Sequence, residues 1–61
     1  MSSNLPLALV TGASRGIGAS IALQLSKDGF HVILNYSSNE AKAREVQARI
    51  IQQGGKADLC Q

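Results

Sequence analysis

Three glycines within seven residues, Gly12, Gly16 and Gly18, stand between an apolar run and a helical pattern, and this arrangement constrains the fold most strongly. The run Leu5–Val10 is apolar without alternation, as in a parallel strand buried on both faces. It is too short, and Gly12 follows it too closely, for a buried helix. Amide groups at the start of a helix are unpaired and carry partial positive charge. The segment therefore predicts a strand, a tight turn and a helix whose N-terminus can hold a phosphate.

A second strand and helix follow, and then the start of a third strand. His31–Asn35 is apolar in its middle, and Lys56–Gln61 has the pattern of a strand that has just begun. Ser37-Ser-Asn-Glu40 matches a capping box, so we expect Ser37 to be the N-cap of the second helix. Gly29 and Gly54-Gly55 are expected to end the two helices. The residues expected on the buried faces of the helices are Ile17, Gly18, Ile21, Ala22 and Leu25, then Ala43, Val46, Ile50 and Ile51.

The alternation of strands and helices predicts an α/β fold with a parallel sheet and right-handed crossovers. The predicted fold is a Rossmann-type βαβαβ segment with the strands in the order 3-2-1. In this order both helices cover one face of the sheet. The other face is lined by alternate apolar residues and has nothing in these 61 residues to cover it. The chain is also shorter than the usual domain of roughly 100–150 residues. We therefore expect an incomplete doubly wound sheet, either a fragment or a chain that a partner completes.

Composition excludes several other classes. One cysteine and one histidine permit no internal disulfide and no cluster of metal ligands. A net charge of +2 and only two aromatic residues do not favour a nucleic-acid surface. No apolar stretch is long enough for a membrane span or for the core of a signal peptide, so we expect a cytoplasmic protein without membrane contacts. Glu40 with Arg44, and Glu45 with Arg49, are spaced as ion pairs on an exposed helix face.

The glycine turn reads Thr11-Gly-Ala-Ser-Arg-Gly-Ile-Gly18 and resembles the Thr-Gly-x-x-x-Gly-x-Gly motif of the short-chain dehydrogenase/reductase family. A Walker A loop is excluded because no Gly-Lys-Ser/Thr follows. With Asn35-Tyr36 at the end of the second strand, the sequence is most similar to the 3-oxoacyl-(acyl-carrier-protein) reductases. The resemblance covers essentially the whole chain. It implies that residues 1–61 are the N-terminal part of a single NAD(P)-binding Rossmann domain, truncated before its catalytic half.

The resemblance also implies a function for the longer protein. That function is the NADPH-dependent reduction of a 3-oxoacyl thioester of acyl carrier protein, in fatty acid biosynthesis, by a homotetramer. The family's catalytic Ser, Tyr and Lys come from later elements, so no catalytic residue is expected here and the chain alone should be inactive. Three alternatives stay open. One is a stand-alone nucleotide-binding module without catalysis, which another chain would complete, and the second is a truncated product that does not fold. The third is the start of a reductase for a sugar, steroid or quinone carbonyl.

The choice between NAD and NADP follows from charge. A carboxylate at the end of the second strand binds the ribose hydroxyls of NAD and repels the 2′-phosphate of NADP. The resemblance assigns that place to Tyr36, which is uncharged, and puts Arg15 where NADP-preferring members carry a basic residue. Ser37 can serve both as a helix cap and as a ligand contact. We therefore predict NADP(H), bound by Gly12, Ser14, Arg15, Gly16, Ile17, Gly18, Asn35, Tyr36 and Ser37.

Four residues that could be taken for catalytic or reactive groups are given no such role. Tyr36 does not match the family's catalytic Tyr-x-x-x-Lys, because the residue four positions on is Glu40. His31 is expected to be structural or on the surface, and Cys60 to be a small buried hydrophobe. Asp58 has no carboxylate or histidine at a useful spacing, so we expect it to be exposed and unpartnered.

Overall fold

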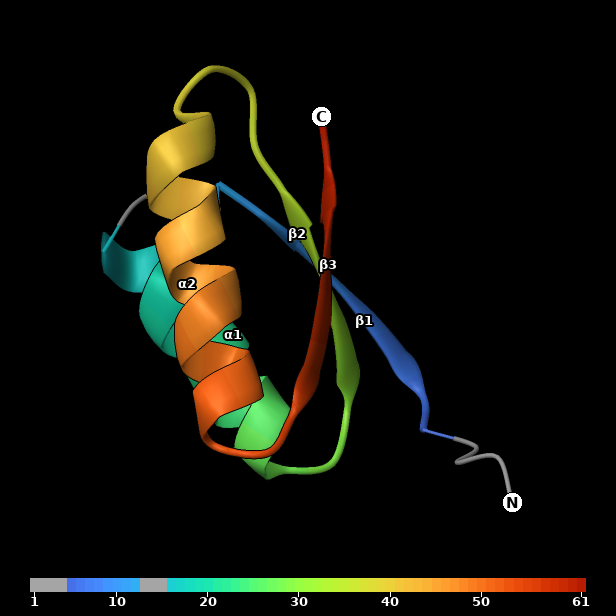
Figure 1. Cartoon of the computed structure of the whole chain (residues 1–61). Coiled ribbons are helices and arrows are strands. Elements are labelled where there is room, and N and C mark those ends of the chain that lie inside the picture. Colours follow the sequence, from blue (N-terminus) through green and yellow to red (C-terminus); the bar gives the residue numbers. More distant parts are fainter. Residues whose placement is uncertain (1–4, 13–15) are drawn as a thin grey trace.

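The computed structural model of the chain describes residues 5–12 and 16–61, which form five elements in one layer of strands and one of helices (Figure 1). This arrangement confirms the predicted Rossmann-type βαβαβ segment. The elements are β1 (Leu7–Thr11), α1 (Gly16–Lys27), β2 (His31–Asn35), α2 (Glu40–Gln52) and β3 (Lys56–Cys60).

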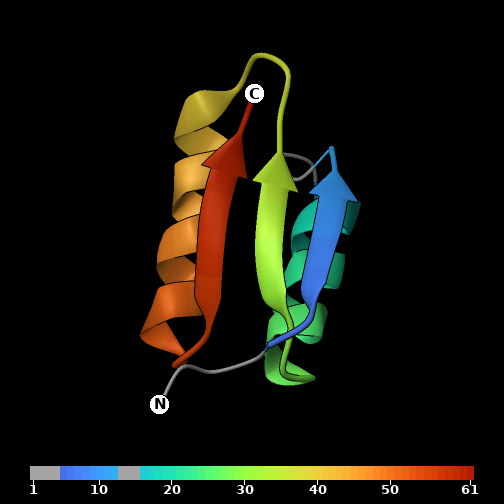
Figure 2. The same ribbon diagram turned by 90° about the vertical axis from the view of Figure 1, so that its right-hand side faces the viewer.

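The three strands are all parallel and lie in the order β1-β2-β3, as predicted. The register pairs Leu7 with His31 and His31 with Lys56, so the carboxyl ends of the strands reach one edge of the sheet together. Both helices lie on the same face, behind the sheet in the view of Figure 2. The sheet therefore has one face that the helices cover and one that no described element covers, called the uncovered face below.

The core fills the space between the sheet and the helices. Val32 and Leu34 of the central strand are fully buried beneath the helices. Ile50 of α2, on the helix side of the same core, is also fully buried. The same cluster of buried residues includes Val10, Ala22, Val46 and Ala57. No helix among the described residues combines the length and the apolar character that crossing a membrane requires.

The uncovered face is apolar along β1. The side chains of Leu7 and Leu9 are 68% and 64% exposed, and Ile33 beside them is only half-buried. Alternate strand residues point to opposite faces of a sheet, so the buried Val10 and the exposed Leu9 belong to different faces. The predicted uncovered apolar face is confirmed.

The helix faces differ in part from those expected. Ile17 and Ile21 are 79% and 49% exposed, whereas Gly18, Ala22 and Ser26 are the buried residues of α1. The helix packs on the sheet through these small residues, and the expected Leu25 is only half-buried against the core, as is Leu23. On α2 the expected stripe of Ala43, Val46 and Ile50 is buried, but Ile51 is exposed.

The start of α2 corrects the capping prediction. Asn39, not Ser37, is the N-cap, and its side-chain oxygen accepts a hydrogen bond from the Lys42 amide at 3.2 Å. The helix begins at Glu40, so Ser37 lies two residues too early to reach the free amides of the first turn. The expected pair of Glu40 with Arg44 forms at 2.7 Å.

Three further expectations need correction. Glu45 pairs with Lys42 at 3.8 Å, and Arg49 is not within ion-pair distance of it in the part of the chain that the structure describes. Cys60 is exposed, because it lies on the uncovered face with Asp58. Asp58 is exposed as expected, but it does have a partner, since its Oδ2 lies 2.7 Å from Nε2 of His31.

Strand β1 begins two residues later than the apolar run. Pro6 has no amide hydrogen to donate, although its carbonyl accepts a hydrogen bond from the His31 amide at 2.8 Å. Strand β2 matches its predicted bounds, and Gly29 and Gly54 end the helices with φ of 94° and 90°.

A tight contact joins the end of α1 to the turn before β3. A Cβ added to Gly55 would collide with the Ser26 hydroxyl and approach Cγ2 of Ile50 to 3.0 Å. The Ser26 hydroxyl is itself buried and has no hydrogen-bond partner among the described residues. Ser26 and Gly55 therefore share one small space.

We predict that Gly55→Ala lowers the free energy of unfolding by about 1–3 kcal/mol, because the extra methyl overpacks this space. Ser26→Ala should be neutral or stabilising, because it removes a buried hydroxyl that no described residue bonds. In the double variant the cost of Gly55→Ala should shrink, which urea denaturation of all four proteins would measure. Additive effects of the two substitutions would contradict the shared space.

Candidate functional site

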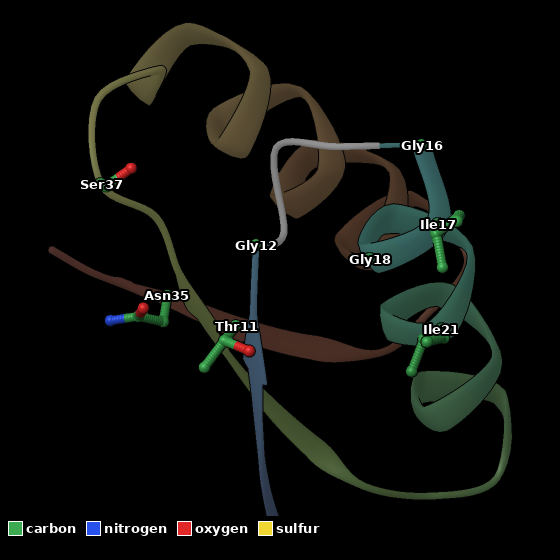
Figure 3. Close-up of a pocket in the computed structure, with 8 residues that line it drawn as sticks. All are labelled: Thr11, Gly12, Gly16, Ile17, Gly18, Ile21, Asn35 and Ser37. Atoms are coloured by element: carbon green, nitrogen blue, oxygen red, sulfur yellow. The ribbon is translucent and has the colours of Figure 1, made fainter.

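A cavity of about 640 Å³ opens at the carboxyl edge of the sheet, between β1, β2 and the start of α1 (Figure 3). Parallel strands joined by crossover helices bring their carboxyl ends and the helix N-termini to the same edge, where ligands of such sheets bind. The cavity is lined by Thr11, Gly12, Gly16, Ile17, Gly18, Ile21, Asn35 and Ser37.

The N-terminus of α1 forms one wall of the cavity. Gly16, Ile17 and Gly18 are the first three residues of the helix, and all three line the cavity. Their amide groups precede the first complete helical turn, so they have no partner within the helix and present partial positive charge. The first turn contains no acidic residue that would repel an anion. This wall can therefore bind a phosphate through its backbone.

Gly12 turns the chain away from β1 toward this helix. Its φ is 67°, in the left-handed region that L-residues with a side chain adopt only at a cost. A Cβ at Gly12 would meet nothing within 4 Å, so the conformation and not the space requires glycine here. Gly18 is buried, as expected from its place on the buried face of the helix.

The end of β2 forms the opposite wall. Ser37 lies on the exposed loop after β2, and Figure 3 shows its hydroxyl turned to the side on which Gly12 lies. Asn35 also lines the cavity, but its amide nitrogen points away from Thr11 and donates a hydrogen bond to the Cys60 carbonyl at 3.3 Å. Tyr36 is buried and does not line the cavity.

The structure thus brings together six of the nine predicted residues: Gly12, Gly16, Ile17, Gly18, Asn35 and Ser37. Ser14 and Arg15 lie outside the described residues. The prediction missed Thr11 and Ile21, which also line the cavity. Their signals were present in the sequence, since Thr11 begins the glycine motif and Ile21 follows Ile17 by one helical turn.

No carboxylate lines this cavity in the part of the chain that the structure describes. The carboxylate of Glu40 is bonded to Arg44 in the first turn of α2. Asp28 follows the far end of α1, where its carboxylate accepts a hydrogen bond from Gln24 at 3.2 Å. The described part of the site therefore suits an anionic ligand.

The chain matches the short chain dehydrogenase family over residues 6–61, which is nearly its whole length. It belongs to this family. The match confirms the resemblance found in the glycine motif.

Relatives within the family differ in their named activities. The chain is 55% identical over 47 residues to a 3-oxoacyl-(acyl-carrier-protein) reductase of Staphylococcus aureus, covering 77% of the chain and 19% of the relative. It is 53% identical over 51 residues to versicolorin reductase 1 of Dothistroma septosporum, covering 84% of the chain and 19% of the relative. The chain thus spans about a fifth of the length of these relatives.

A solved structure of a metagenomic short-chain oxidoreductase in complex with NADP has the same arrangement of elements. It superposes with a TM-score of 0.84 at 43% sequence identity, over 95% of this chain and 27% of that one. At this identity and coverage the likeness extends to the whole described fold.

We predict that Gly12→Ala lowers the free energy of unfolding by about 1–2 kcal/mol, because alanine must then adopt a positive φ. Gly16→Ala is the matched control, since a Cβ there also meets nothing within 4 Å but lies in a helix. That variant should be neutral or slightly stabilised, because alanine favours the helical conformation. Urea denaturation without ligand measures both, and equal effects would contradict the role assigned to Gly12.

Proposed function

We propose that this chain is the NADP(H)-binding part of an oxidoreductase of the short-chain dehydrogenase family. The observation that carries the proposal is the cavity in which the free amides of α1 face the ends of β1 and β2. Its donors are neutral backbone groups at a helix N-terminus, which suit the diphosphate of a dinucleotide. The NADP complex of the metagenomic oxidoreductase supports this reading.

The absence of a carboxylate from the described lining favours NADP over NAD. A ribose that carries a 2′-phosphate needs a polar, uncharged or basic surface at the end of β2. Ser37 supplies a hydroxyl there, and Asn35 lines the same end with its amide nitrogen bonded to the Cys60 carbonyl. Arg15, inside the glycine motif, is proposed to add a guanidinium whose planar donors match phosphate oxygens, and Ser14 a hydroxyl.

The proposed activity of the longer protein is the reduction of a 3-oxoacyl thioester carried by acyl carrier protein, in cytoplasmic fatty acid biosynthesis. NADPH bound in the cavity supplies a hydride for a carbonyl carbon. The named relative from Staphylococcus aureus supports this substrate, and versicolorin reductase supports the alternative of another carbonyl. We further propose that the longer protein is a homotetramer.

The role of this chain in that reaction is to bind and orient the cofactor. Tyr36 is buried and is followed four residues later by Glu40, so it is not proposed as a proton donor. The proton donor and the groups that bind the substrate are proposed to come from further elements of the longer protein. The 61 residues alone are therefore proposed to bind the cofactor without turnover.

We predict that NADPH binds the chain at least about tenfold more tightly than NADH. A charge-assisted hydrogen bond to the 2′-phosphate contributes about 1.5–3 kcal/mol, and 1.4 kcal/mol corresponds to tenfold in affinity. Because each cofactor binds only the folded chain, both dissociation constants follow from the rise of the unfolding midpoint with cofactor concentration.

Arg15→Glu should remove this preference, because the new carboxylate repels the 2′-phosphate. Lys56→Glu is the matched control, with the same change of charge at the amino end of β3, opposite the cavity. It should leave the ratio of the two dissociation constants unchanged. Equal affinity for NADPH and NADH in the unaltered chain, or an unchanged ratio in Arg15→Glu, would contradict the proposed cofactor choice.

A further inference from the structure

We propose that Gln61 is a positioning residue of the cofactor site, which holds Ser37 at the 2′-phosphate end of the cavity. The inference rests on the proposed function, because it concerns the same cavity. Its basis is a hydrogen bond from the side-chain amide of Gln61 to the backbone carbonyl of Ser37, at 3.1 Å.

This bond continues the pairing of β2 with β3 beyond the ends of both strands. The last backbone bond on that side runs from the Tyr36 amide to the Cys60 carbonyl, at 3.0 Å. Ser37 comes next, in the loop between β2 and α2. The Gln61 side chain thus adds one further bond at the point where the cavity begins.

Asn35 strengthens the same connection. Its side-chain amide donates to the Cys60 carbonyl, which therefore accepts two hydrogen bonds from consecutive residues of the β2 end. The nitrogen of Asn35 is thus directed to β3, and among the cavity residues at this end the Ser37 hydroxyl is the one turned to the Gly12 side (Figure 3).

The loop that carries Ser37 is held at two places. Toward α2, the side-chain oxygen of Asn39 accepts a hydrogen bond from the Lys42 amide and fixes the start of the helix. Toward β2, Gln61 fixes the Ser37 carbonyl. A side chain held in its binding position before the ligand arrives loses less conformational entropy on binding, so the Gln61 bond favours binding at Ser37.

The test uses Gln61→Met in the 61-residue chain, since methionine has a similar length and no amide donor. NADPH should bind this variant about three- to fivefold more weakly, as the loss of one ordinary hydrogen bond implies, whereas NADH affinity should change little. Gln61→Asn keeps the amide but is one methylene shorter, so it should behave in the same way.

Gln53→Met is the matched control. Gln53 makes the same kind of bond, from its side-chain amide to the Leu23 carbonyl at 3.3 Å, but outside the cavity. Its loss should leave the ratio of NADPH to NADH affinity unchanged, even if the unfolding midpoint falls. A purely structural role of Gln61 would give the same result as this control.

The outcomes separate the two proposals. Failure of the unaltered chain to bind NADPH would overturn the proposed function and, with it, this inference. If the unaltered chain prefers NADPH and both Gln61 variants show the same ratio of NADPH to NADH affinity as the unaltered chain, the positioning role alone is overturned. Equal weakening of NADPH and NADH would also overturn it, because the bond would then act on the cavity as a whole.

Discussion

The parallel pairing of β1 with β2 is the interaction on which the rest of the structure depends. Two adjacent parallel strands require a crossover, and α1 supplies it on one face of the sheet. The chain must therefore leave β1 at Thr11, turn at Gly12 and enter α1 at Gly16, next to the carboxyl end of β2. The helix amides face the end of the neighbouring strand because a right-handed crossover begins at the carboxyl ends of the parallel strands and returns the chain to the start of β2.

The same pairing explains the division of the sheet into two unlike faces. Both crossovers run on one side, so the helices bury Val32 and Leu34 there and leave Leu7 and Leu9 exposed on the other. Helix α1 buries its small residues Gly18, Ala22 and Ser26, and the exposed Ile17 and Ile21 line the cavity. The cavity is thus a consequence of the packing and not a separate feature.

Sequence reasoning recovered the element order and the strand order, and six of the predicted site residues line one cavity, because glycine spacing and apolar periodicity are local signals. It misplaced the N-cap, since Ser37 and Asn39 are both good caps and only the start of α2 decides between them. It missed the His31–Asp58 contact, which joins residues 27 positions apart and follows from the register of β2 with β3. It also placed Ile17 and Ile21 on the buried face of α1, because the apolar pattern of one helix does not show which side of it approaches the sheet.

The most direct test of the account is a titration of the isotopically labelled chain with NADPH, followed by the chemical shifts of its backbone amides. If the start of α1 holds the diphosphate, the largest changes occur at Gly12, Gly16, Ile17 and Gly18. The amides of Gly54 and Gly55, in the turn before β3, should hardly change. Binding accompanied by unchanged amides at the start of α1, with the largest changes on the uncovered face of the sheet, would contradict the account.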